Sequence, residues 1–109
     1  MKIYKYSITL NTPMGIKKGT LIRYAEYNRD AESGYIEALG KKNPYLAKVR
    51  PDGECSMTVT LKTIIRDHNF CGSGYIYPDK LDITLHGGKA NLLMQGEIKE
   101  VTSENEKVL

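Results

Sequence analysis

The sequence has no tryptophan, one phenylalanine, two cysteines and no apolar run near the length of a membrane-spanning helix. Two cysteines are too few for a disulfide scaffold or a zinc ribbon. A spanning helix needs about 20 mostly apolar residues, so a helical membrane protein is excluded as well. The excess of positive charge is also small, since 16 Lys and Arg against 13 Asp and Glu give a net charge of +3. Nucleic-acid readers usually concentrate far more basic charge than this.

What is present is typical of one soluble globular domain: 109 residues, of which 40% are hydrophobic and 27% charged. The N-terminal residues alternate between polar and apolar side chains instead of forming the apolar core of a secretory signal. We therefore expect a cytoplasmic protein that does not associate with membranes.

Turn-forming residues recur about every ten positions, which is typical of an all-β domain. The segments between them are rich in valine, isoleucine, threonine and tyrosine, the residues that suit a half-buried sheet. They predict a single antiparallel meander of about eight strands, at residues 2–10, 16–27, 33–39, 45–50, 54–66, 69–77, 80–86 and 89–99.

Residues that face each other across a hairpin lie on the same side of the sheet, so predicted pairs can be tested for agreement. Folding the chain at Pro51-Asp52-Gly53 places Val49 opposite Cys55, and folding at Pro78-Asp79 places Ile76 opposite Leu81. The turns predicted at residues 40–44, 67–69 and 87–88 give three further pairs: Ile36 with Val49, Val59 with Ile76, and Ile83 with Leu92. All five turns predict one shared apolar face.

Gly72, Gly74 and Gly96 fall on that apolar face, where glycines mark sharp bends or a close approach of two layers. A meander of this size hides its edges when its last strand pairs with its first. We therefore expect residues 1–102 to form a single small up-and-down β-barrel domain, followed by a polar, frayed tail at 103–109. A flattened β-sandwich is the alternative, and a short helix near 21–32 also fits the apolar spacing there.

A succession of strand-and-turn motifs covers nearly the whole chain: Lys18-Gly19-Thr20-Leu21, Ser33-Gly34-Tyr35-Ile36, Lys42-Asn43-Pro44-Tyr45, Pro51-Asp52-Gly53, Leu61-Lys62-Thr63 and Leu85-His86-Gly87. In this succession the chain resembles small bacterial all-β proteins of about its length. As a group these proteins resemble minimal calycin-type barrels. The resemblance implies a barrel fold and no particular activity.

Asp67, His68 and Cys71 are the sharpest candidates for catalysis, because a thiol nucleophile needs a base within hydrogen-bond reach. The predicted register places His68 at a turn and Cys71 on the outer face of a strand, about 10 Å away. A Cys/His enzyme is therefore a disfavoured alternative, and we expect no catalytic residues. Cys55 is predicted to face inward and Cys71 outward, so both thiols should be free.

Metal and cofactor sites lack their usual signatures. His68 and His86 lie beside different turns, and no Cys-x-x-Cys or His-x-x-x-His spacing accompanies them. The glycines at 72–74 and 87–88 precede no predicted helix, so the backbone cradle of a phosphate-binding loop is missing. We expect neither a metal nor a cofactor.

The leading functional prediction is a non-enzymatic barrel that acts by binding a small apolar ligand or a protein partner. An interior pocket for an apolar ligand would be lined by Leu61, Ile76, Ile83, Leu92 and Met94. A protein partner, such as a second copy in a homo-oligomer, would contact the outward tyrosines Tyr35, Tyr75 and Tyr77.

Nucleic-acid binding is the other alternative. The same outward tyrosines could stack on bases beside a basic rim formed by Lys17, Lys18, Lys41 and Lys42. Carboxylates on the same surface oppose this interpretation, because they would repel phosphates; they are Glu37, Asp82 and Glu97.

Overall fold

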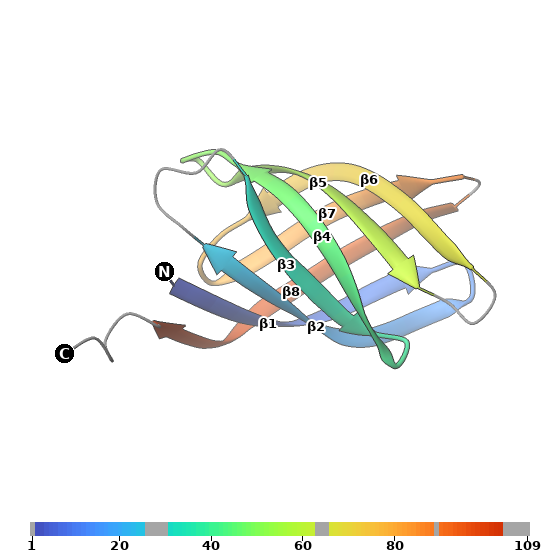
Figure 1. Ribbon diagram of the computed structural model, residues 1–109, viewed down its shortest axis with the longest axis horizontal. Coiled ribbons are helices and arrows are strands. Elements are labelled where there is room, and N and C mark those ends of the chain that lie inside the picture. The colour runs from blue at the N-terminus through green and yellow to red at the C-terminus, as the bar shows by residue number, and fades with distance from the viewer. Residues whose placement is uncertain (1, 26–30, 63–65, 89, 104–109) are drawn as a thin grey trace.

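The computed structural model describes residues 2–25, 31–62, 66–88 and 90–103, and the regular structure within these ranges is all β-strand (Figure 1). The strands are β1 (Lys2–Thr12), β2 (Gly15–Ala25), β3 (Glu32–Ala38), β4 (Lys41–Val49), β5 (Glu54–Lys62), β6 (Asp67–Ile76), β7 (Lys80–Gly87) and β8 (Ala90–Ser103). Each strand pairs antiparallel with the next, and β8 pairs with β1 to close a barrel. The predicted eight-strand meander is confirmed, with the barrel rather than the sandwich as its form.

Two hairpins have the register that the sequence predicts. Val49 pairs with Cys55 between β4 and β5, and Ile76 pairs with Leu81 between β6 and β7. Both turns contain proline followed by aspartate, which fixes the position of the turn within a residue or two.

The other three predicted registers are wrong, although every residue in them lies on the predicted face. The observed pairs are Ile36 with Asn43, Val59 with Phe70, and Ile83 with Met94. Each partner is displaced by an even number of positions (49 to 43, 76 to 70 and 92 to 94). Side chains alternate with a period of two, so an even shift leaves the apolar face intact.

The position of the turn explains the first two of these shifts. Leu39 and Gly40 both have positive φ, 57° and 74°, and form the tight connection between β3 and β4. Residues 41–44, predicted as part of the turn, are therefore the start of β4. Asp67 likewise begins β6, so the turn predicted at 67–69 lies within a strand. Residues 63–65, between β5 and β6, lie outside the described residues.

The helix considered near 21–32 is wrong for residues 21–25, which belong to β2 and pair with β1 on one side and β3 on the other. Leu21 and Arg23 are buried on the inner side. Ile22 is buried as well, but it lies on the other face, where the ladder pairs it with Lys5 and Tyr35. Residues 26–30 of that segment lie outside the described residues.

The division into a domain at 1–102 and a tail at 103–109 stays a prediction. β8 continues to Ser103, the first residue of the predicted tail, and residues 104–109 lie outside the described part of the chain. Within the described residues, no helix is long and apolar enough to cross a membrane.

Inward side chains from all eight strands form one buried hydrophobic cluster. Its members are Tyr6, Ile8, Leu10, Leu21, Ile36, Ala38, Tyr45, Ala47, Cys55, Met57, Val59, Leu61, Ile76, Leu81, Ile83, Leu85, Leu92 and Met94. Burial of this apolar surface is the main stabilising contribution that the fold offers. The shared apolar interior predicted from the hairpins is confirmed.

Two glycines of β6 allow the barrel wall to bend against β7. A Cβ atom built on Gly72 would lie 2.8 Å from the Cα of Leu85, and one on Gly74 would lie 2.7 Å from the Cα of Ile83. Both distances are shorter than any real Cβ contact, so a larger residue would push the two strands apart. The predicted close approach at these inward glycines is confirmed.

Asn43 is a fully buried polar residue that the sequence analysis placed in a turn. It lies in β4 just before Tyr45, where the β4–β5 ladder ends. Its side-chain nitrogen donates to the carbonyl of Ile36 at 2.9 Å, and its side-chain oxygen accepts from the amide of Lys62 at 2.7 Å. The oxygen thus supplies a hydrogen bond between β4 and β5 beyond the end of their ladder, and the nitrogen supplies one to β3.

Candidate functional site

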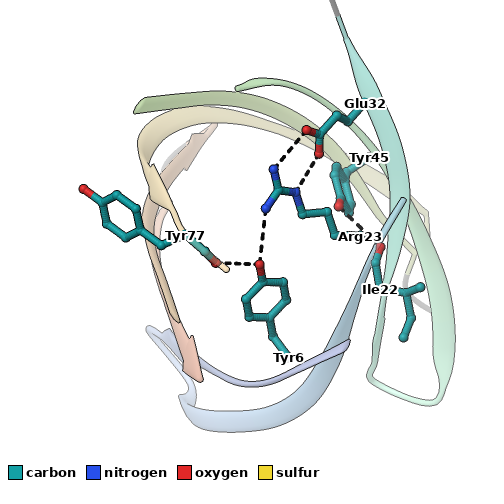
Figure 2. Close-up of polar contacts among 6 residues, drawn as sticks. All are labelled: Tyr6, Ile22, Arg23, Glu32, Tyr45 and Tyr77. Carbon is teal, nitrogen blue, oxygen red and sulfur yellow. Dashed lines mark hydrogen bonds and ion pairs between the residues drawn. The ribbon is translucent and has the colours of Figure 1, made fainter. Parts of the chain in front are cut away.

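A polar cluster lies inside the barrel at the end where β2 finishes and β3 begins (Figure 2). Arg23 of β2 points into the interior, and its Nε and Nη2 donate to the two carboxylate oxygens of Glu32 at 2.7 and 3.0 Å. Its Nη1 donates to the hydroxyl of Tyr6 at 3.4 Å. We call Tyr6, Arg23, Glu32 and Tyr45 the Arg23 cluster.

The two tyrosines of the Arg23 cluster tie together strands that are not neighbours in the sheet. The Tyr6 hydroxyl donates to the carbonyl of Tyr77, which follows β6, at 2.6 Å. The Tyr45 hydroxyl of β4 donates to the carbonyl of Ile22 in β2 at 3.3 Å. Figure 2 shows both hydroxyls directed at backbone oxygens across the interior. These two hydrogen bonds connect β1 to the residue after β6 and β4 to β2, and they restrain this end of the barrel.

An aromatic ring adds to the environment of the guanidinium. Arg23 lies over the ring of Tyr4, 5.1 Å from its centroid, and the Tyr4 ring stacks on Tyr6 with centroids 6.2 Å apart. A cation over an aromatic face is stabilised by the ring quadrupole, and more strongly when both are removed from water.

Burial and pairing set the ionisation of these groups. Burial alone would lower the pKa of Arg23, but its hydrogen bonds to Glu32 and Tyr6 outweigh burial and raise it above the ordinary value. Burial raises the pKa of Tyr6 and of Tyr45. Burial, with a smaller effect of the Glu32 charge, raises the pKa of the Cys55 thiol to about 11. Arg23 therefore stays charged, and the Cys55 thiol stays protonated near neutral pH.

These contacts make the Arg23 cluster a structural feature. Three guanidinium nitrogens already donate, and both carboxylate oxygens of Glu32 already accept. The sequence analysis did not identify Arg23 or its partner Glu32 as site residues. The available signal was an arginine that alternates with Leu21 on the apolar side of a predicted strand.

The five residues predicted to line a ligand pocket do come together in the interior. Leu61, Ile76, Ile83, Leu92 and Met94 are at most 6% exposed and belong to the one core cluster. They come from β5 to β8 and pack with side chains from the other four strands. That a ligand enters between them stays a prediction.

Two of the predicted interface tyrosines lie side by side on the outer face. The rings of Tyr75 and Tyr77 stack with centroids 5.9 Å apart and planes 11° apart, and Tyr75 is 45% exposed. They border a groove of about 670 Å³, which we call the Tyr75 groove. It runs from these rings over β7 and β8 to β1, and its further lining includes Ser7, Thr9, Lys80, Asp82, Gln95 and Glu97.

The third predicted tyrosine borders a different groove. Tyr35 of β3 packs beside Tyr24, with ring centroids 6.3 Å apart, and the ammonium of Lys42 lies 4.8 Å from the Tyr35 centroid. Both rings line a groove of about 630 Å³ together with Leu46, which is 59% exposed. The three tyrosines therefore divide between two outer grooves and do not form one patch.

β6 keeps the candidate catalytic pair apart. His68 pairs with Leu61 of β5, whereas Cys71 pairs with Thr58, so the two side chains lie on opposite faces of the strand. His68 lies within β6 and not at a turn as predicted, whereas Cys71 is on the outer face, as predicted. Cys55 is buried, Cys71 is exposed, and both are free thiols, as predicted.

Charged side chains near the grooves are mixed in sign. Asp82 and Glu97 line the Tyr75 groove together with Lys80. Carboxylates at this position oppose the binding of phosphates beside the tyrosine rings. Within the described residues, no group of three or more His, Cys, Asp or Glu is arranged to hold a metal ion.

Comparisons with known proteins agree with the fold and give no activity. No protein-family model matches the sequence. No curated protein matches it either. A solved structure described as a redesigned beta barrel superimposes with a TM-score of 0.68, covering 88% of this chain and 90% of that one. The two sequences are 9% identical, so the likeness shows the fold alone: this chain is an eight-stranded antiparallel barrel similar to a small designed barrel.

Proposed function

We propose that the protein is a non-enzymatic binding protein that contacts a segment of another protein through the Tyr75 groove. The observation that carries the proposal is the stacked Tyr75–Tyr77 pair, which borders a groove across four strands of the outer face. Tyrosine supplies a large contact area, a polar hydroxyl and few rotatable bonds, and it is enriched where proteins meet.

The lining of the groove combines aromatic rings with polar side chains. The two rings form an aromatic wall, whereas Ser7, Thr9 and Gln95 provide hydroxyl and amide groups that both donate and accept hydrogen bonds. A peptide segment presents the same mixture of apolar side chains and backbone polar groups. An aromatic anchor beside hydrogen-bonding groups is the usual composition of a protein contact site.

The Tyr77 ring is held in place before any partner arrives. It lies against Gly53, whose backbone has a φ of +95°, and a Cβ atom at this position would collide with the ring. Tyr75 stacks on the ring so positioned. A contact surface that is already ordered loses less conformational entropy on binding.

The interior offers less support for a ligand than the outer face. The five predicted pocket residues are packed into the core cluster, and the Arg23 cluster occupies one end of the interior. An apolar ligand inside would have to displace packed side chains, which costs free energy at native packing density.

A selection from a displayed library of random peptides, with the intact protein as bait, tests the proposal. We expect enriched peptides that bind the wild-type protein and lose at least roughly tenfold in affinity with Tyr75→Ala. Tyr35→Ala, in the other groove, is the matched control and should bind the same peptides normally. Peptides that ignore Tyr75→Ala, or no enrichment at all, would reject the Tyr75 groove as the contact site.

The proposal also covers the absence of enzymatic activity, the cellular compartment and the likeness to known barrels. The absence of enzymatic activity is supported by the protonated, buried Cys55 and by the separation of His68 from Cys71. Two free thiols suit a reducing compartment such as the cytoplasm. The up-and-down order of the strands supports the likeness to calycin-type barrels, which stays a proposal along with a bacterial origin.

A further inference from the structure

β8 extends beyond the strand on one of its sides. The β7–β8 ladder ends where Lys80 pairs with Glu97, whereas the β1–β8 ladder continues until Lys2 pairs with Ser103. Figure 1 shows the end of β8 projecting past the turn that joins β6 to β7. The last part of β8 therefore leaves the barrel wall while still paired to β1.

A β-bulge separates this part of β8 from the barrel. Tyr6 pairs with Ile98 and Lys5 with Glu100, so Lys99 is an extra residue between the two pairs. Beyond it, no strand of the described residues pairs with residues 99–102 on the side away from β1. We call residues 99–102 the β8 edge. An exposed strand edge presents backbone N–H and C=O groups that can pair with another strand.

The side chains of the β8 edge indicate which strand would fit. Val101 is 48% exposed and pairs with Tyr4, so it faces the inner side of the sheet with only partial cover. Lys99 and Glu100 carry opposite charges, so the edge as a whole is neutral and does not repel a copy of itself. An apolar residue with a polar residue on each side is suited to antiparallel pairing with its own sequence.

We propose that the β8 edge pairs antiparallel with the same edge of a second copy, with the two-fold axis at Val101. Val101 then lies directly opposite Val101 of the second copy, and Glu100 lies opposite Thr102. The pairing buries the exposed valines against each other and joins two barrels through one continuous sheet. Because the edge is short, the dimer is weak and depends on concentration.

Cysteine cross-linking tests this register directly. In a Cys71→Ser background, Val101→Cys places two thiols on directly opposite residues, whose Cα atoms lie about 4.5–5.5 Å apart in an antiparallel pair. That separation is suitable for a disulfide. Thr102→Cys is the matched control, since Thr102 is diagonal to its own copy at about 7–8 Å. We expect Val101→Cys to form a linked dimer roughly tenfold faster than Thr102→Cys under mild oxidation.

Sedimentation of the untreated protein gives the second readout. The average mass of the wild-type chain should rise above 12.3 kDa with concentration, whereas Val101→Lys should stay at the mass of the monomer. Equal cross-linking of the two cysteine variants, or a wild type that remains monomeric throughout, would overturn the proposal. Tyr75→Ala should dimerise normally, so this proposal and the Tyr75 groove can fail independently.

Discussion

Tyr6 and Tyr45 lie inside the barrel, whereas Tyr75 and Tyr77 lie on its outer face, and the two pairs use the same side chain differently. Inside, each hydroxyl donates to a backbone carbonyl of a distant strand, and Tyr6 also accepts from Arg23. Outside, the rings stack on each other along a groove. Figure 2 contains both situations, because Tyr77 directs its ring outward while its carbonyl accepts from Tyr6.

The difference shows how burial determines what a tyrosine hydroxyl must contact. A buried hydroxyl without a partner costs free energy, so an inward tyrosine is useful only where a carbonyl or a charged group is in reach. A partly exposed tyrosine has water as a partner, and its ring stays available to a second molecule. We therefore propose that the inner pair contributes to stability and that the outer pair contributes to binding.

The largest expected effect comes from removing the charge that supports the inner pair. Arg23→Leu leaves the carboxylate of Glu32, which is 11% exposed, without its partner, and removes a donor to Tyr6. Breaking a buried ion pair from one side costs about 3–5 kcal/mol of unfolding free energy. Urea denaturation followed by circular dichroism measures this loss.

The double variant Arg23→Leu/Glu32→Leu is the control for that measurement. It removes both charges, so much of the lost stability should return. A double variant no more stable than Arg23→Leu would show that the cost comes from packing and not from an unpaired carboxylate.

A smaller effect separates the inner from the outer hydroxyls. Tyr6→Phe removes the hydrogen bond to the Tyr77 carbonyl and should lower the unfolding free energy by about 1–2 kcal/mol. Tyr77→Phe keeps that carbonyl and the outer ring, so its effect should stay within about 0.5 kcal/mol. Equal losses in urea denaturation of the two variants would contradict the division between inner and outer tyrosines.

The smallest effect concerns alkaline pH. Burial raises the pKa of the Cys55 thiol to about 11 in the folded protein, above its ordinary value of 9.0, so the thiol of the unfolded chain ionises first as the pH rises. The stability contributed by the protonated thiol is full below pH 9 and is lost as the pH approaches about 11. Cys55→Ala should flatten the decline of the urea midpoint across this range, and Cys71→Ala, at the exposed thiol, should leave it unchanged. A decline of full slope in Cys55→Ala would refute this assignment.

The faces of the strands were predictable from the sequence, and their registers were only partly so. Alternation has a period of two, so Val59 was placed inward whether its partner was Ile76 or Phe70. The correct partner of Ile36 depends on the turn at Leu39 and Gly40, and nothing in the sequence indicated that Leu39 adopts a positive φ. A hydrogen-bonded turn of proline and aspartate, by contrast, fixed the β6–β7 register.

Polar residues inside the barrel were the hardest part of the site to predict. Arg23 and Asn43 are buried because partners from other strands satisfy them, namely Glu32 for Arg23 and Lys62 for Asn43. Such pairs depend on the closed barrel and leave no local pattern in the chain. Tyr75 and Tyr77 were predictable as outward residues, since their place follows from alternation along β6.

Native mass spectrometry of the freshly purified protein tests most directly whether the interior or the outer face binds. We expect the bare mass of the 12.3 kDa chain, or whole multiples of it, with no small molecule retained. A retained apolar molecule that survives Tyr75→Ala but disappears when Ile83→Phe fills the interior would contradict this expectation.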